Sequence, residues 1–186
     1  MLGLSAPAMD MAPPPPEPAF VLLSGFMGAG KSTVARLLAA RLGLPCVDLD
    51  QEIGLAAGMD IRGIFAARGE AGFRTLEAEI LQKVLRGPVA VVALGGGAVL
   101  NPESRAAARR GGLLVTLAVD AQTAAKRLRG AADRPLLDAD PLVLAARLDA
   151  RAEAYADADL LIDTHGRTAE DVATVLFAAL NGRPDL

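Results

Sequence analysis

Residues 25–32 read GFMGAGKS, which matches the pattern G-x-x-x-x-G-K-[ST]. An apolar run at residues 20–24 precedes it, and a helix-forming stretch begins at Lys31. A strand, a glycine-rich loop and a helix in this order bring backbone N–H groups and the positive end of the helix dipole onto phosphate oxygens. The stretch therefore predicts a nucleotide-binding phosphate loop, in which Lys31 reaches the β and γ phosphates and the Ser32 hydroxyl binds Mg²⁺.

Short apolar runs alternate with amphipathic stretches along the rest of the chain, which is typical of βαβ units and a parallel sheet. Five parallel strands with helices between them make a three-layer α/β/α sandwich, and we predict that residues 19–182 form it as one domain. The predicted strands lie at residues 20–24, 45–49, 89–94, 113–118 and 160–163. The predicted helices lie at residues 31–42, 61–68, 71–86, 102–110, 121–129, 142–156 and 169–180.

Three segments do not fit this layered pattern. Residues 1–18 contain four consecutive prolines and predict a disordered, extended tail, and residues 183–186 predict a second tail. Residues 129–141 are rich in proline, aspartate and small residues, and they connect two helices instead of a strand and a helix. We interpret this stretch as a mobile lid that carries Arg134, with an ordinary surface loop as the alternative.

Composition limits the classes of function. With 186 residues, a formal net charge of −3 and a pI near 5.2, the chain suits one domain without a basic field for nucleic acid or an anionic membrane. No charge-free stretch reaches the ~20 apolar residues of a membrane span, and no basic flank marks a signal peptide, so we expect a cytoplasmic protein. The lone Cys46 excludes an intrachain disulfide, and the lone His165 is interpreted as a solvated loop residue.

Candidate acceptor-binding residues follow the second and third predicted strands. Asp48 and Asp50 end the second strand, at the sheet edge where open α/β folds bind ligands. Asp48 can hold Mg²⁺ through water and Asp50 can accept a proton from an attacking hydroxyl, or the pair can simply cap a helix. Residues 95–97 are three glycines, which let a ligand approach the backbone closely. Arg74 suits a paired contact to a carboxylate, with an ordinary surface position as its alternative.

Taken together, these motifs resemble the shikimate kinase family, of the nucleoside-monophosphate-kinase-like P-loop group. The resemblance runs from about residue 20 to residue 180. It lies in the phosphate loop through Thr33, in Asp48-Leu49-Asp50, in residues 69–77 with Arg74 and Glu77, in Leu94-Gly95-Gly96-Gly97, in Arg134-Pro135-Leu136-Leu137, and in Arg151 with Tyr155.

The resemblance implies a sheet of strand order 2-3-1-4-5 and ATP-dependent phosphorylation of the shikimate 3-hydroxyl, with Mg²⁺ as cofactor, by a monomer. It implies Asp50, Lys31 and Arg134 as catalytic residues and Asp48, through water, with Ser32 at the metal. It implies shikimate contacts from Asp50, Arg74, Gly96, Gly97 and Arg151. The implied ATP contacts come from Gly28, Ala29, Gly30, Lys31, Ser32, Thr33, Arg127, Arg134 and Arg167.

Two departures from the family pattern and two alternatives accompany this interpretation. The lid carries the acidic residues Asp133, Asp138 and Asp140, which bear on how it closes. Glu153 stands where the family's Arg-x-Pro-x-Tyr element has proline, which predicts a more regular helix around Arg151. The first alternative is another small-molecule kinase on the same scaffold, such as a gluconate or nucleotide kinase. The second is a nucleotide-binding regulator that has lost catalysis.

Overall fold

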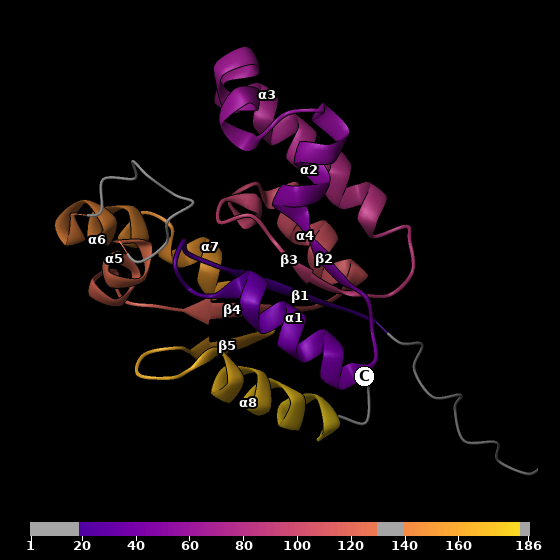
Figure 1. Ribbon diagram of the computed structural model, residues 1–186, viewed down its shortest axis with the longest axis vertical. Coiled ribbons are helices and arrows are strands. Elements are labelled where there is room, and N and C mark those ends of the chain that lie inside the picture. Colours follow the sequence, from indigo (N-terminus) through magenta and orange to yellow (C-terminus); the bar gives the residue numbers. More distant parts are fainter. Residues whose placement is uncertain (1–18, 130–139, 183–186) are drawn as a thin grey trace, which may run out of the picture.

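The computed structural model describes residues 19–129 and 140–182, and Figure 1 shows them as helices around one sheet. Five parallel strands form this sheet in the order β2-β3-β1-β4-β5, as predicted. The strands are β1 (Phe20–Gly25), β2 (Cys46–Asp48), β3 (Val91–Ala93), β4 (Gly112–Ala118) and β5 (Leu160–Asp163).

The middle of the sheet is apolar because helices cover it from both sides. All six residues of β1 are buried, and β1 pairs with β3 on one side and with β4 on the other. A parallel strand covered on both faces is expected to be continuously apolar instead of alternating. The strand predicted at residues 20–24 therefore corresponds to β1, which is the central strand of the sheet.

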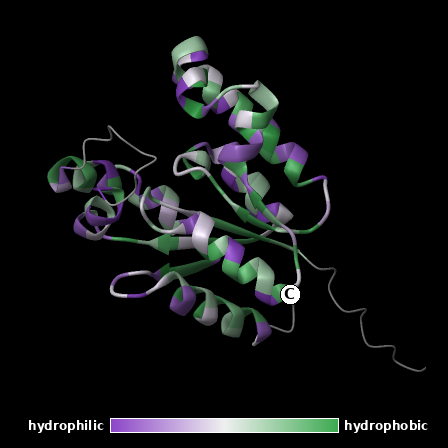
Figure 2. Cartoon of the chain, viewed as in Figure 1, coloured by the Kyte–Doolittle hydropathy of each residue, from purple (hydrophilic) through white to green (hydrophobic). Residues whose placement is uncertain are grey.

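The helices form the two outer layers. They are α1 (Lys31–Leu42), α2 (Leu49–Ala57), α3 (Ile61–Val84), α4 (Pro102–Gly111), α5 (Ala121–Arg129), α6 (Pro141–Asp149), α7 (Ala152–Ala156) and α8 (Ala169–Asn181), with the short 3-10 helix η1 (Ala98–Leu100). Helices α1 and α8 lie side by side against one face, and α4 packs on the sheet beside α3 (Figure 1). Figure 2 shows green, apolar strands between helices of mixed polarity.

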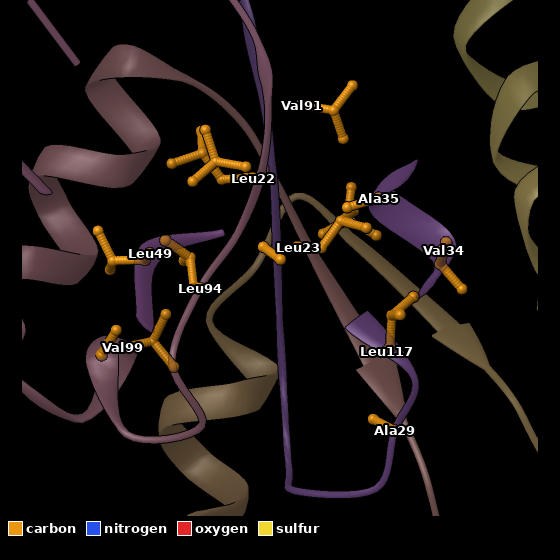
Figure 3. Close-up of a cluster of buried hydrophobic side chains, with 14 of the residues drawn as sticks. Leu22, Leu23, Ala29, Val34, Ala35, Leu49, Val91, Leu94, Val99 and Leu117 are labelled. Atoms are coloured by element: carbon orange, nitrogen blue, oxygen red, sulfur yellow. The ribbon is translucent and has the colours of Figure 1, made fainter. Parts of the chain in front are cut away.

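The core between these layers is aliphatic, as expected for a chain with five Phe, one Tyr and no Trp. Figure 3 shows side chains from β1, α1, β3, β4 and the start of α2 gathered in it, among them Leu22, Leu23, Val34, Ala35, Leu49, Val91 and Leu117. These residues fix α1 against the sheet. The glycine-rich loop between β1 and α1 is therefore anchored at both of its ends.

Helix α2 was not predicted. The Asp48 side chain caps it by accepting hydrogen bonds from the backbone N–H groups of Asp50 and Gln51, at 3.1 and 3.4 Å. The helix ends at Gly58, which has the left-handed conformation with φ of 66°. Both signals were present in the sequence, but the helix has only nine residues and contains Gly54, which weakens its helical signature.

The two helices predicted at residues 61–68 and 71–86 correspond to α3. Its backbone is non-helical at Gly69, with φ of 66° and ψ of −176°, so two helical segments meet at a kink. The positive φ explains why glycine stands at this position. The prediction of two segments agrees with the chain's local geometry.

The single helix predicted at residues 142–156 is wrong. Helix α6 ends at Asp149, and α7 starts after Arg151, whose φ of −114° and ψ of −1° depart from helical values. The more regular helix expected from Glu153 does not form either. Arg151 lies over the Phe26 ring and Tyr155 bonds the Gly96 carbonyl oxygen, so α7 has its own contacts with the loops after β1 and β3.

Some predictions concern residues 1–18, 130–139 and 183–186, which lie outside the described residues. They are the two tails, most of the lid and the position of Arg134. No helix within the described ranges is long and apolar enough to cross a membrane. His165 is an exposed loop residue, as predicted, and its Nδ1 lies 2.7 Å from Oδ2 of Asp120.

Candidate active site

The loop between β1 and α1 has the backbone geometry that its glycines predict. Gly25, Gly28 and Gly30 all have positive φ, between 78° and 133°. A Cβ at Gly25 would lie 2.4 Å from the carbonyl oxygen of Leu117, so no other residue fits there. Lys31 Nζ donates to the carbonyl oxygens of Gly25 and Phe26, at 2.9 and 3.1 Å. The ammonium group therefore lies over the loop where phosphates are expected.

A large pocket of about 1060 Å³ opens beside this loop. Its walls come from the β1–α1 loop, the end of β2, α3, the loop after β3, α5 and Arg151. Charged residues of both signs line it, namely Lys31, Arg62, Arg74, Arg127, Arg151, Asp48, Asp50, Asp60 and Glu77. Parallel strands place their carboxyl ends at one edge of the sheet, which is why residues far apart in sequence meet here.

Asp48 and Asp50 both line the pocket, but their local roles differ. Asp48 ends β2 and caps α2, so the structural alternative considered for this residue is realised. Asp50 lies in the first turn of α2, and its Oδ1 would be 2.9 Å from a Cβ at Gly95. The Asp50 carboxylate therefore faces the glycine loop that follows β3.

Arg74 and Glu77 form an ion pair inside this pocket. Nη1 of Arg74 donates to Oε2 of Glu77 at 2.7 Å, and Nη2 lies 3.4 Å from Oε1 of the exposed Glu70. The Glu77 side chain is only 3% exposed, and burial raises its pKa against the opposing effect of Arg74. Oε1 of Glu77 is buried without a hydrogen-bond partner among the described residues, so it is available to a ligand or water.

The three glycines after β3 make room for these charged groups. A Cβ at Gly95 would lie 2.6 Å from Oε1 of Glu77, and one at Gly97 would lie 2.5 Å from Nη1 and Nη2 of Arg74. Gly96 faces the phosphate loop, since its Cβ would lie 3.9 Å from Nζ of Lys31. The glycine loop therefore stands between the charged acceptor side of the pocket and Lys31.

Arg151 and Tyr155 close this side of the pocket from α7. The Arg151 guanidinium lies over the Phe26 ring, 5.7 Å from its centroid, and the Tyr155 hydroxyl donates to the Gly96 carbonyl oxygen at 2.6 Å. Burial raises the pKa of Tyr155, and a hydrogen bond from Arg151 opposes that rise. The contacts of Arg151 and Tyr155 therefore join α7 to the phosphate loop and to the glycine loop after β3.

Arg127 connects the phosphate loop to the segment after β5. Its Nη1 donates to the carbonyl oxygen of Gly28 at 3.1 Å and to Oγ1 of Thr164 at 3.2 Å. Its Nη2 donates to the carbonyl oxygens of Thr164 and Arg167, at 3.1 and 3.5 Å. These bonds make Arg127 a link between two loops as well as a wall of the pocket.

Most of the predicted site residues meet in this one pocket. They are Gly28, Gly30, Lys31, Ser32, Thr33, Asp48, Asp50, Arg74, Gly96, Gly97, Arg127 and Arg151. Ala29 is buried and does not line the pocket, and neither does the exposed Arg167. Arg134 lies outside the described residues.

The sequence did not assign roles to several residues that the structure places in the pocket. Glu77 is the most important of these, and its spacing of three residues from Arg74 is a helix-face signal that could have revealed it. Phe65 and Phe73 stack with their ring centroids 4.5 Å apart, and both line the pocket. An apolar stacked pair carries no sequence signal that separates a pocket wall from the core.

The residues present fit a Mg²⁺ ion that is held mainly by a nucleotide. No group of three or more His, Cys, Asp or Glu side chains within residues 19–129 and 140–182 is arranged to hold a metal. Ser32 and Asp48 line the same pocket as the phosphate loop, and both offer oxygen ligands. Mg²⁺ prefers oxygen, keeps several waters and takes few protein ligands.

A phosphate loop at the carboxyl edge of a 2-3-1-4-5 parallel sheet, facing a pocket of cations and carboxylates, defines a P-loop phosphotransferase. A family model described as "Shikimate kinase" matches residues 27–181. The chain belongs to the shikimate kinase family.

Individual relatives agree with this membership. Shikimate kinase of Geobacter metallireducens is 46% identical over 88% of this chain and 92% of its own length. Shikimate kinase of Geobacter sulfurreducens is 49% identical over 83% of this chain and 86% of its own length. Both matches cover more than four fifths of this chain.

Solved structures agree as well. Shikimate kinase from Acinetobacter baumannii, in complex with shikimate, superposes with a TM-score of 0.82 at 33% identity, covering 90% of this chain and 96% of that one. A gluconokinase from Sinorhizobium meliloti superposes with a TM-score of 0.60 at 16% identity, over 90% of this chain and 94% of that one. The gluconokinase likeness shows only the fold.

Proposed function

We propose that this chain transfers the γ-phosphoryl group of ATP to the 3-hydroxyl of shikimate, producing shikimate 3-phosphate and ADP. The observation that carries the proposal is the meeting of Lys31, Asp50, Arg74 and Arg151 in one pocket at the phosphate loop. Both substrates are anions, and the chain has a net charge of −3, so it must gather cations locally where the two meet. Because the chain belongs to the shikimate kinase family, we take shikimate as the acceptor.

In the proposed reaction, Asp50 accepts the proton of the 3-hydroxyl as the oxygen attacks the γ-phosphorus. The bond between that phosphorus and the oxygen bridging to the β-phosphate breaks, and ADP leaves with the electron pair. Lys31 and Arg134 stabilise the charge on the migrating group, because phosphoryl transfer depends mainly on positioning and electrostatics. Arg74, Arg151 and the backbone of Gly96 and Gly97 hold the shikimate carboxylate.

The donor side of the proposal uses the loop between β1 and α1. The backbone of residues 28–33 would hold the phosphates, and Arg127 and Arg167 would flank the adenine. Ser32 and, through water, Asp48 would hold Mg²⁺, which when bound neutralises charge on the β and γ phosphates.

The cellular setting follows from the reaction. Because the donor is ATP, we propose that the chain works in the cytoplasm, in the biosynthesis of aromatic amino acids. A monomeric state stays a prediction, which sedimentation of the purified chain will test.

An ADP-release assay tests the function directly. Purified chain with Mg-ATP is given shikimate, gluconate or AMP in separate reactions, with acceptor-free reactions as the control. Release that depends on shikimate alone is expected. Release with gluconate or AMP would instead support a different kinase of the same fold, and acceptor-independent release or none would support a nucleotide-binding regulator.

A further inference from the structure

Tyr155 is the only tyrosine of the chain, and it lies behind the pocket instead of in it. Its side chain lines a smaller apolar cavity of about 190 Å³ with Phe26, Leu148 and Leu161. The residue is 6% exposed, yet its hydroxyl makes a 2.6 Å hydrogen bond to the carbonyl oxygen of Gly96, 59 residues earlier. The buried hydroxyl is therefore satisfied by a backbone group that itself lines the large pocket.

The bond to Gly96 fixes a whole peptide plane. In a trans peptide the N–H points opposite to the C=O, so the Gly96 carbonyl held against Tyr155 turns the N–H of Gly97 away from Tyr155. Gly97 faces Arg74, whose guanidinium nitrogens lie 2.5 Å from where its Cβ would be. Glycine has the widest conformational freedom of any residue, so this loop needs an external contact to hold one orientation.

The Tyr155 side chain also interacts with Arg151, since a side-chain hydrogen bond from Arg151 opposes the burial that raises the Tyr155 pKa. Residues 151 and 155 lie one helical turn apart, and the backbone N–H of Tyr155 donates to the carbonyl oxygen of Arg151 at 3.1 Å. The Arg151 guanidinium lies over the Phe26 ring, and the carbonyl oxygen of Phe26 accepts a hydrogen bond from Lys31 at 3.1 Å. One phenol oxygen therefore stands between an arginine of the pocket and the glycine loop.

We propose that the Tyr155 hydroxyl is a positioning group for the carboxylate of the acceptor, because it holds the Arg151 guanidinium and the Gly96–Gly97 peptide in one relative geometry. This inference rests on the proposed function. Tyr155 does not line the large pocket, so it acts through its two neighbours and not on the reacting atoms.

The Tyr155→Phe variant tests the inference, because it keeps the ring and removes only the hydroxyl. The KM for shikimate is expected to rise roughly three- to tenfold, the effect of losing one hydrogen bond, while kcat and the KM for ATP stay within about twofold. An unchanged KM for shikimate, or a loss confined to kcat or to the KM for ATP, would overturn the proposal. Wild-type chain that does not phosphorylate shikimate would instead overturn the proposed function and this inference together.

Two further variants separate positioning from stability. Thr116→Val removes a buried hydroxyl that bonds Ser24 at 2.6 Å outside the large pocket, and it is expected to lower Tm without changing the KM for shikimate.

In a double-mutant cycle, Tyr155→Phe combined with Arg151→Ala is expected to raise the KM for shikimate by less than the product of the single effects. Fully multiplicative effects would mean that the hydroxyl does not act through Arg151.

A measurement on the chain without substitutions tests the proposal even if the Tyr155→Phe variant does not fold. Because the chain has one tyrosine, growth with 3-fluorotyrosine gives a protein with a single ¹⁹F NMR signal from Tyr155. That signal is expected to shift when shikimate is added. A signal that does not respond to saturating shikimate would contradict the proposed coupling.

Discussion

At Gly97 the absence of a side chain leaves space for the guanidinium of Arg74. A methyl group there would lie 2.5 Å from Nη1 and Nη2. Its φ of −117° is open to any residue, so the position is restricted by space and not by backbone strain. The charged end of a flexible side chain can move away, so a substitution is expected to disturb binding more than folding.

Gly97→Ala is therefore expected to raise the KM for shikimate roughly tenfold, the cost of one displaced charge-assisted hydrogen bond, with little change in Tm. Steady-state kinetics and thermal unfolding measure the two effects. Gly182→Ala is the matched control, because its nearest neighbour would lie 3.5 Å away and both values should stay unchanged. A tenfold effect from the control, or none from Gly97→Ala, would contradict this account of the glycine.

Asp50 is the proposed proton acceptor, and Asp50→Asn removes its basicity while nearly keeping its shape. We expect kcat to fall by roughly 10²–10⁴, the usual contribution of a general base, with ADP affinity unchanged. Coupled kinetics and calorimetric titration with ADP measure the two quantities. The exposed Asp149, outside the pocket, provides Asp149→Asn as the control, and unchanged turnover of Asp50→Asn would remove Asp50 from its role.

Glu77 makes stability depend on pH. Its pKa in the folded chain is raised above the ordinary value of 4.5, first by burial, so the folded state holds this proton more tightly than the unfolded state. The contribution of Glu77 to the free energy of unfolding is therefore full below pH 4.5 and is lost as pH rises through the folded pKa.

Glu77→Gln, which cannot titrate, should remove that part of the pH dependence above pH 4.5. Urea unfolding at several pH values from there to neutrality gives the slope. Glu79→Gln, an exposed position on the same helix, should leave the wild-type slope intact. A steeper fall of stability in Glu77→Gln than in wild type would be the contrary result.

Among the elements, α7 is held by hydrogen bonds at Tyr155 and at Asp157. Tyr155 bonds Gly96 near its middle, and Asp157, which follows its last residue, accepts a 2.7 Å bond from Nε of Arg105 on α4. Nη1 of Arg105 also donates to the carbonyl oxygen of Val99 in η1 at 2.6 Å. One arginine therefore joins α4, the 3-10 helix after the glycine loop, and the end of α7.

Removing the Arg105 side chain should weaken this anchor without touching the pocket, and it leaves Asp157 with its bond from Arg109. Arg105→Ala is expected to lower Tm by roughly 2–6 °C and to raise the KM for shikimate more than that for ATP. Arg110→Ala, an exposed arginine on the same helix, is the control and should change neither. A fall in Tm with both KM values unchanged would show that α7 keeps its position without Arg105.

At the scale of the whole molecule, the sheet begins at Phe20, which is already buried. Removing residues 1–18 is therefore expected to leave Tm, kcat and both KM values unchanged, because a proline-rich stretch cannot join a sheet or helix core. Thermal unfolding and the ADP-release assay on the shortened chain check this. A lower Tm or altered kinetics would show that the predicted tail contributes to the domain.

The class of fold and the backbone geometry of the phosphate loop could be predicted from the amino-acid sequence. The run at residues 20–24 and the glycines at 25, 28 and 30 act locally: apolar strands must be buried, and positive φ favours glycine. Both effects depend on residues that are close together in the sequence, so the sequence alone reveals them. The same holds for the helix boundaries at Lys31, Ala121 and Ala169, which agree with the predicted ones.

The contacts between distant residues in and around the pocket depend instead on how the chain folds in three dimensions. The bonds of Tyr155 to Gly96, Arg127 to Gly28 and Arg105 to Asp157 join residues 59, 99 and 52 positions apart. The break at Arg151 likewise overrode a helical pattern that ran through it. Contacts of this kind leave no periodic signal in the sequence, because they depend on where the sheet brings the ends of separate elements together.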